Sequence, residues 1–88
     1  MNSTIPAPGV AVLGCGTVGG ATAQLLYSDE ALIQERSGIP VRLKYIVDLD
    51  FSHARSLGLP ESAFTSDLDA VLADPEVGIV VETVGGLT

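Results

Sequence analysis

Short apolar runs recur along the chain, and they are separated by stretches with a different periodicity. Residues 9–14 form an apolar run that contains β-branched residues and is bounded by glycines. Residues 41–47 first alternate and then become wholly apolar, and residues 77–81 are the run richest in β-branched side chains. Such runs are typical of buried strands. Residues 63–65 add a weaker candidate, so the pattern predicts four strands.

Helical periodicity fills the interval between the first two strands. After Gly16, apolar residues recur at steps of three and four as far as residue 33, and Gly38 is a natural helix end. The pattern predicts helix over this interval. It leaves open whether there is one long helix or two pieces, with Ser28 capping the second.

Two shorter helices are expected in the second half of the chain. Residues 51–57 are compatible with a short helix that Gly58 ends. Ser66 and Asp69 form a capping-box pattern, so a further helix is expected to begin at Asp67. The dipeptide at 74–75, Asp-Pro, is expected to end it.

Strands that alternate with helices predict a parallel sheet, because each helix returns the chain to the same end of the sheet. Right-handed crossovers then give an α/β domain that is half of a Rossmann fold, with strand order 3-2-1-4. We expect residues 1–8 to be a flexible lead-in. Residues 9–88 are expected to be one truncated dinucleotide-binding domain.

Composition limits what such a domain can bind. Four basic residues against eleven acidic ones give a formal charge of −7 without any cluster of Lys or Arg, which argues against nucleic-acid binding. The apolar stretches are far shorter than the roughly 20 residues that cross a bilayer, so no membrane partner is expected. With 47% hydrophobic residues in 88, some apolar surface stays exposed. We therefore expect self-association through a strand or helix surface.

The amino-terminal residues and the cysteine content bear on location. Residues 1–8 lack the basic and apolar regions of a secretion signal. Cys15 is the only cysteine, which excludes an internal disulfide and fits a reducing compartment. A cytoplasmic protein is expected.

A glycine motif follows the first predicted strand and opens the first predicted helix. Residues 14–19, Gly-Cys-Gly-Thr-Val-Gly, match G-x-G-x-x-G. In this pattern the first glycine permits a tight turn, the second lets a pyrophosphate approach the backbone, and the third allows close packing of helix on strand. The helix amino terminus supplies unpaired N–H groups and a positive dipole end. Dinucleotide binding is predicted, against the alternative of a structural corner without a ligand.

An acidic residue at the end of the second strand tests this prediction. Asp48 occupies that place, 29 positions beyond Gly19, where roughly 20 is usual. Such a carboxylate accepts hydrogen bonds from ribose hydroxyls and repels a 2′-phosphate, so it favours NAD. Asp50 is a competitor, either residue could be a turn residue or helix cap, and Arg55 keeps NADP open as the cofactor.

Three further residues have chemistry of their own. Cys15 lies inside the glycine motif, either as a reactive thiolate or as a small residue that fits. His53 has no partners at metal-ligand spacing, so a solvated helix position is expected and no metal site is predicted. Glu82 ends the fourth predicted strand, which is expected to be buried. Two interpretations of Glu82 fit equally well: a residue of the binding site, or a carboxylate that only ends the strand.

With these residues in hand, the chain resembles the amino-terminal segment of homoserine dehydrogenases over residues 10–86. Residues 12–19 are similar to the nucleotide loop of that family. The second match discriminates better between families: an acidic-proline turn at 74–77, an apolar strand, and then residues 82–86, Glu-Thr-Val-Gly-Gly.

This resemblance implies reduction of aspartate 4-semialdehyde to homoserine with NAD or NADP. It implies two groups of cofactor-binding residues, a pyrophosphate loop of Gly14, Gly16, Thr17, Val18 and Gly19, and backbone near the nicotinamide ribose at Thr83, Gly85 and Gly86. Members often place a basic residue beside the acid after the second strand, whereas Val47 and Leu49 flank Asp48 here. That departure favours NAD.

The residues that perform the chemistry in this family lie beyond the equivalent of Thr88. These are a catalytic lysine, acidic substrate-binding residues and a dimerising substrate domain. No catalytic residue is therefore assigned, and the isolated chain is expected to be inactive. Two alternatives stay open: a regulatory nucleotide-sensing module, and another amino-acid or semialdehyde dehydrogenase.

Overall fold

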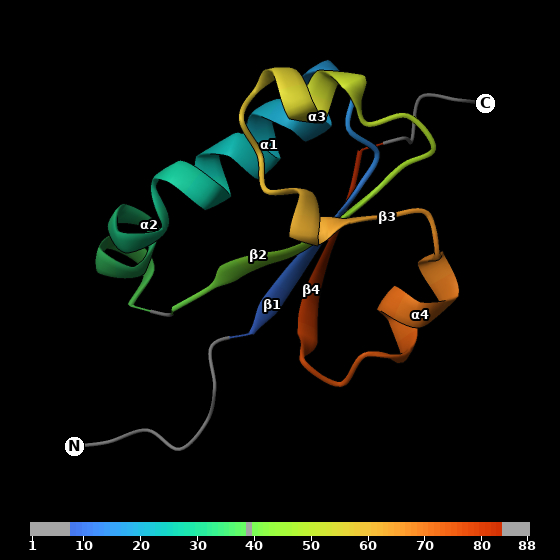
Figure 1. Cartoon of the computed structure of the whole chain (residues 1–88). Helices are drawn as coiled ribbons and strands as arrows, with labels where there is room; N and C mark the ends of the chain where they lie inside the picture. Colours follow the sequence, from blue (N-terminus) through green and yellow to red (C-terminus); the bar gives the residue numbers. More distant parts are fainter. Residues whose placement is uncertain (1–7, 39, 84–88) are drawn as a thin grey trace.

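The computed structural model describes residues 8–38 and 40–83, which form a four-stranded parallel sheet with helices on both faces (Figure 1). The strands are β1 (Gly9–Leu13), β2 (Arg42–Val47), β3 (Phe64–Thr65) and β4 (Val77–Glu82). They lie in the order β3-β2-β1-β4. The half-Rossmann topology predicted from the sequence is thereby confirmed.

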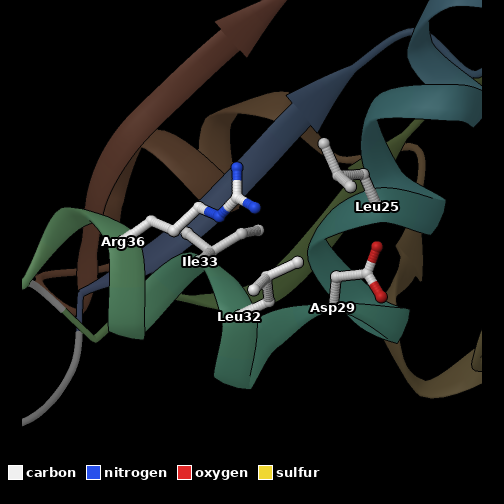
Figure 2. Close-up of a pocket in the computed structure, with 5 residues that line it drawn as sticks. All are labelled: Leu25, Asp29, Leu32, Ile33 and Arg36. Carbon is white, nitrogen blue, oxygen red and sulfur yellow. The ribbon is translucent and has the colours of Figure 1, made fainter.

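The helices lie where the sequence periodicity predicted them, and the structure shows whether the first helical interval is one helix or two. The first helical interval is two helices, α1 (Thr17–Ser28) and α2 (Glu30–Ser37), which meet at Asp29 (Figure 2). Ser28 is the last residue of α1, and Asp29 takes the N-cap position of α2 without a side-chain hydrogen bond. Gly38 ends α2 in the left-handed conformation, with φ at 75°.

Two short helices follow, and the cap of the second lies one residue later than predicted. They are α3 (Ser52–Ser56) and α4 (Leu68–Ala73). Asp67, rather than Ser66, is the N-cap of α4, because its carboxylate accepts the Ala70 N–H at 3.0 Å. The predicted Ser66–Asp69 capping box is therefore wrong: Asp is as good a cap as Ser, and the Asp67 N–H itself donates to the Thr65 hydroxyl.

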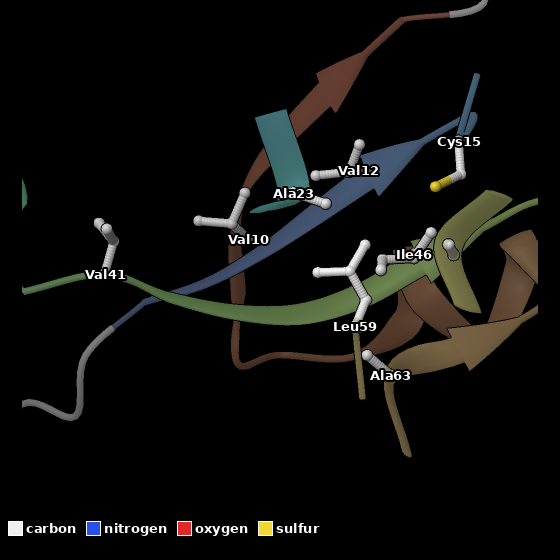
Figure 3. Close-up of a cluster of buried hydrophobic side chains, with 9 residues drawn as sticks. Val10, Val12, Cys15, Ala23, Val41, Ile46, Leu59 and Ala63 are labelled. Carbon is white, nitrogen blue, oxygen red and sulfur yellow. The ribbon is translucent and has the colours of Figure 1, made fainter. Parts of the chain in front are cut away.

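The helices divide between the two faces of the sheet. Figure 1 shows α1, α2 and α3 on one face and α4 on the other, as right-handed crossovers require. The main hydrophobic core lies under α1 and α3 (Figure 3). Its buried members are Val10, Val12, Cys15, Ala23, Val41, Ile46, Ala54, Leu59 and Ala63.

Burial separates the central strand from the edge strand. Residues 9–12 of β1 are all buried, as predicted for a strand covered on both faces. The prediction of burial is wrong for β4, where Ile79 is 40% exposed and Val80 is 44% exposed. Within the described residues β4 pairs only with β1 and is an edge of the sheet. Within residues 8–38 and 40–83, no helix has the length and apolar character to span a membrane.

Candidate functional site

The glycine motif forms the corner between β1 and α1. Gly14 has φ at 96°, a left-handed conformation that favours glycine. Its N–H donates to the Val47 carbonyl at 2.8 Å, which ties the corner to the end of β2. The corner therefore lies at the carboxyl ends of two neighbouring parallel strands, where α/β sheets bind ligands.

Gly16 leaves open space at the start of α1. It is the N-cap residue, and a Cβ atom built on it would meet no other atom within 4 Å. No side chain caps α1, and its first turn contains no acidic residue. The first N–H groups of a helix have no intrahelical acceptor, and the helix dipole is positive there. This end of α1 is suited to bind an anion through backbone groups alone.

Gly19 has the opposite surroundings, because α1 approaches the corner too closely for a side chain. A Cβ atom on Gly19 would lie 1.9 Å from the Gly14 carbonyl oxygen and 2.6 Å from Thr83 Oγ1. Bringing the helix this close requires glycine at this position. The contact fixes the direction in which the amino end of α1 points.

Thr83 holds the chain after β4 against the same corner. Its N–H donates to the Leu13 carbonyl at 3.0 Å. Its hydroxyl lies 2.8 Å from the Leu13 carbonyl oxygen and 3.0 Å from that of Gly14, so one proton is shared between two acceptors. Thr83 therefore positions the glycine corner as well as lying beside it.

Asp48, at the end of β2, bonds directly to the glycine corner. Its Oδ2 accepts the Cys15 N–H at 2.7 Å, and its Oδ1 accepts the Leu49 N–H at 2.7 Å. The hydrogen bond from the Cys15 N–H has the larger effect and that from the Leu49 N–H the smaller. Both lower the pKa of Asp48 below its ordinary value, so the carboxyl group is ionised. A carboxylate has about four acceptor positions, so Asp48 retains capacity for ribose hydroxyls.

The Cys15 side chain fills space in the core. It is 3% exposed and belongs to the main hydrophobic cluster. Burial, and then the nearby Asp48 carboxylate, raise the pKa of the Cys15 thiol. The thiol is protonated at neutral pH, which favours the packing role over a reactive thiolate.

The competing charged residues are engaged in other contacts. Asp50 accepts the Ser52 N–H at 2.9 Å at the start of α3, which is the turn role weighed above. Arg55 pairs with Glu61 at 3.3 Å, and its guanidinium lies 5.7 Å from the centre of the Phe64 ring. Neither contact involves the glycine corner.

The remaining candidates divide into described and undescribed residues. Thr17 and Val18 lie exposed at the start of α1, where Val18 is 66% exposed. His53 is exposed on α3, and Glu82 lies opposite Leu13 in the sheet register. Gly85 and Gly86 lie outside the described residues. Among residues 8–38 and 40–83, no three His, Cys, Asp or Glu side chains gather where they could hold a metal ion.

Sequence reasoning missed two contacts of this site. The motif spacing identified Asp48 and Thr83, but it did not indicate that the Asp48 carboxylate accepts a corner N–H or that the Thr83 hydroxyl bonds the corner carbonyls. The available signal was the position of both residues at the carboxyl ends of strands that flank β1. Residues at such strand ends lie beside the same corner.

Fold and corner together define the class of the protein, an α/β domain of the Rossmann type. Residues 14–88 match a family model described as "Homoserine dehydrogenase, NAD binding domain". The chain therefore belongs to the homoserine dehydrogenase family, and the matching region is its NAD-binding domain.

Individual relatives agree with the family match. The homoserine dehydrogenase of Methylobacillus glycogenes is 37% identical over 79 residues, which is 90% of this chain and 19% of that protein. That of Bacillus subtilis is 31% identical over 78 residues, 89% of this chain and 18% of that protein. A crystal structure of the S. aureus homoserine dehydrogenase at pH 8.5 matches with a TM-score of 0.72 and 28% identity, covering 89% of this chain and 20% of that one.

The chain thus spans about a fifth of the length of the relatives that it matches. The part matched is the nucleotide-binding domain, which supports a nicotinamide cofactor. Among the alternatives that the sequence left open, these similarities favour homoserine dehydrogenase over a sensing module or another semialdehyde dehydrogenase.

Proposed function

We propose that residues 9–88 are the first part of a dinucleotide-binding domain that holds a pyrophosphate at the glycine corner. In this proposal the cofactor contacts the backbone of Gly14, Gly16, Thr17, Val18 and Gly19. The observation that supports it best is the open space in front of Gly16 at an uncapped helix start. An alanine side chain there would point into the space that a ligand needs.

We further propose that the cofactor is NAD rather than NADP. Asp48 is ionised and lies beside the corner, so it would accept ribose hydroxyls and repel a 2′-phosphate. The exposed Leu49 offers no positive charge to such a phosphate, and Arg55 pairs with Glu61. Thr83, Gly85 and Gly86 would lie near the nicotinamide ribose, as the family resemblance implies.

The proposed activity of the intact protein is the interconversion of aspartate 4-semialdehyde and homoserine, in a cytoplasmic step of threonine and methionine biosynthesis. The nicotinamide, when bound, accepts or donates the hydride. The residues of this chain bind and orient the dinucleotide, and none of them is assigned a catalytic role. A reducing cytoplasm suits the single protonated thiol, Cys15.

Separate calorimetric titrations of the chain with NAD and with NADP test the cofactor proposal. We expect NAD to bind more tightly, by at least about tenfold, because a like charge beside a 2′-phosphate costs on the order of 1.4 kcal/mol or more. Tighter binding of NADP would contradict the assignment of Asp48. Absence of binding for both nucleotides would contradict the pyrophosphate site itself.

An activity assay of the isolated chain tests the proposal that its residues bind the cofactor but do not catalyse the reaction. We expect no turnover of homoserine with NAD or NADP, because positioning and protonation of the substrate need residues that this chain does not supply. Measurable turnover that survives repurification of the chain would show that catalytic residues had been overlooked within these 88 positions.

A further inference from the structure

One peptide group of the glycine corner, the group that joins Gly14 to Cys15, is hydrogen-bonded at both of its polar ends. Its carbonyl oxygen, which belongs to Gly14, accepts the Thr83 hydroxyl at 3.0 Å. Its N–H, which belongs to Cys15, donates to Asp48 Oδ2 at 2.7 Å. Two side chains that are far apart in the sequence therefore hold opposite edges of one planar unit. We call these two bonds the peptide clamp.

The strand order explains why the two side chains approach from opposite sides. In a trans peptide group the carbonyl and the N–H point in opposite directions, and no cis peptide bond occurs within the described residues. Because β1 lies between β2 and β4, a peptide group directly after β1 can direct one polar atom toward each neighbour. Asp48 follows β2 and Thr83 follows β4. Each side chain meets the atom that points to its own side.

Gly14 makes this peptide group easy to turn when nothing holds it. Glycine populates positive and negative φ about equally, because it has no Cβ atom, and Gly14 has φ at 96°. A rotation of the peptide group would redirect the chain that enters α1, and with it the N–H groups of residues 16–18. The orientation of these N–H groups therefore depends on bonds between the corner and the rest of the fold.

The Gly14 carbonyl is also packed against α1, where water does not readily replace a lost donor. A Cβ atom on Gly19 would lie 1.9 Å from this carbonyl oxygen and 2.6 Å from Thr83 Oγ1. The Leu13 carbonyl, the second acceptor of the hydroxyl, already accepts the Thr83 N–H at 3.0 Å. An acceptor that is shielded from water and loses its donor destabilises the arrangement by more than the net contribution of one bond. Loss of the Thr83 hydroxyl therefore affects the Gly14 carbonyl most.

We propose that the peptide clamp fixes the direction of the N–H groups at the start of α1, which makes the Thr83 side chain a positioning residue for the cofactor. This inference rests on the proposed pyrophosphate site. The hydroxyl acts on that site through the Gly14–Cys15 peptide group, separately from the backbone contact that the family resemblance implies for Thr83. Asp48 then has two roles, since it holds one edge of the peptide group and retains capacity for ribose hydroxyls.

The variants Thr83→Ser and Thr83→Ala test the positioning role, because both lack the methyl group and only serine keeps the hydroxyl. In calorimetric titrations with NAD, we expect Thr83→Ser to bind within about twofold of the wild type and Thr83→Ala at least about fivefold more weakly. The same two substitutions at Thr22 are the matched control. The Thr22 hydroxyl bonds the Val18 carbonyl at 2.9 Å within α1, so both Thr22 variants are expected to stay within about twofold of the wild type.

Amide hydrogen exchange of the chain without nucleotide observes the peptide clamp itself. We expect the Cys15 N–H to exchange at least about fivefold faster in Thr83→Ala than in Thr83→Ser, because a peptide group that is free at its carbonyl opens more often. The N–H of Val12, a buried residue of β1, is expected to exchange equally in both variants. A general loss of stability would accelerate both amides together, so this comparison separates positioning from stability.

A double-mutant cycle tests whether the two side chains act on one unit. Asp48→Ala removes the acceptor of the Cys15 N–H together with the ribose acceptor, so it weakens NAD binding by itself. When one end of the peptide group is already free, freeing the other end has less effect. The loss of NAD affinity in the Asp48→Ala/Thr83→Ala double variant is therefore expected to be at least about threefold smaller than the product of the two single losses.

Three results would overturn the proposal: equal NAD affinities for Thr83→Ala and Thr83→Ser, equal exchange rates of the Cys15 N–H in these variants, or a double variant whose loss equals the product of the single losses. Circular dichroism checks that each variant is folded, and Thr83→Val, which also lacks the hydroxyl, replaces Thr83→Ala if that variant does not fold. A wild-type chain that does not bind NAD would contradict the proposed pyrophosphate site instead. The exchange rates of the free chain would still decide whether the peptide clamp exists.

Discussion

Gly16 and Gly19 are three residues apart, and a side chain added at one would have surroundings opposite to those at the other. At Gly19 the nearest neighbours are atoms of the protein itself, the Gly14 carbonyl and the Thr83 hydroxyl. At Gly16 a Cβ atom would enter open space at the start of α1. A substitution at Gly19 therefore tests the stability of the fold, and a substitution at Gly16 tests the binding of a ligand.

The pair Gly19→Ala and Gly16→Ala separates these two roles. We expect Gly19→Ala to lower the free energy of unfolding by roughly 1–3 kcal/mol or more, because overpacking against backbone has no easy relief. Gly16→Ala is expected to stay within about 0.5 kcal/mol of the wild type, as a surface substitution does, while weakening NAD binding. Urea unfolding and calorimetry measure the two quantities. Equal effects of both variants on unfolding would contradict the different roles assigned here.

Asp48 is the residue expected to discriminate between the two cofactors. Asp48→Asn keeps an oxygen that can accept the Cys15 N–H, which Asp48 binds at 2.7 Å, but removes the negative charge. We expect the preference for NAD over NADP to fall by at least about tenfold, because the repulsion of the 2′-phosphate is lost.

Asp50→Asn is the matched control, since the Asp50 carboxylate accepts the Ser52 N–H at the start of α3. That variant is expected to preserve the cofactor preference. If Asp50→Asn changes the ratio of the two affinities more than Asp48→Asn does, the ribose acceptor has been assigned to the wrong carboxylate.

At the scale of elements, a cluster of charged side chains connects β2 to the segment before β4. Lys44 pairs with Asp74 at 2.5 Å and with Glu76 at 2.8 Å, and the Tyr45 hydroxyl donates to Asp74 at 2.6 Å. These contacts cross β1, which lies between β2 and β4. Gly9 permits the crossing, because a Cβ atom there would lie 3.1 Å from the Lys44 side chain.

A register shift explains how two consecutive residues reach one carboxylate. Val10 pairs with Leu43 and Ala11 pairs with Tyr45, so Lys44 is an extra residue in β2. Such a bulge redirects side chains that would otherwise alternate between the faces. The cluster joins β2 to the segment before β4, at the end of the sheet opposite the glycine corner.

This cluster makes stability depend on pH in acid. The bonds from Lys44 and Tyr45 lower the pKa of Asp74 to about 2. Since the folded pKa lies below the ordinary value of 3.8, this contribution to stability is present above about pH 4 and is lost as the pH falls through about 2. We expect urea midpoints of Asp74→Asn to change less between pH 4 and pH 2 than those of the wild type.

The control for this experiment is Asp69→Asn, whose carboxylate forms no ion pair within the described residues. Its urea midpoints are expected to follow the wild-type dependence on pH. Parallel curves for Asp74→Asn and the wild type would show that the Lys44–Asp74 contact does not contribute to stability.

Most elements could be predicted from the sequence, because apolar periodicity and glycine positions act locally. The four strands, the end of α2 at Gly38 and the glycine corner are of this kind. The α4 cap could not be fixed, because Ser66 and Asp67 are equally good caps and only the Thr65 contact separates them. The Lys44 bulge and the bond from Cys15 to Asp48 join residues about 30 positions apart, and no local pattern encodes them.

At the scale of the whole molecule, strand order decides both what is buried and what is exposed. Because β1 is central, its carboxyl end lies between those of β2 and β4, and Asp48 and Thr83 both bond to the corner from the two sides. Because β4 is an edge within the described residues, Ile79 and Val80 stay exposed, and Ile79 lines the hollow between α1 and β4. The prediction of burial failed for β4 because an apolar run does not reveal whether a neighbour covers it.

The central claim is that backbone groups at the start of α1 bind the pyrophosphate, without a cationic side chain. A titration of the ¹⁵N-labelled chain with NAD, followed by amide chemical shifts, tests it most directly. We predict that the largest shifts occur at Gly16, Thr17 and Val18, with smaller ones near Asp48, and that Gly16→Ala reduces them at equal NAD concentration. Shifts confined to α2, or none at the start of α1 at saturating NAD, would contradict the claim.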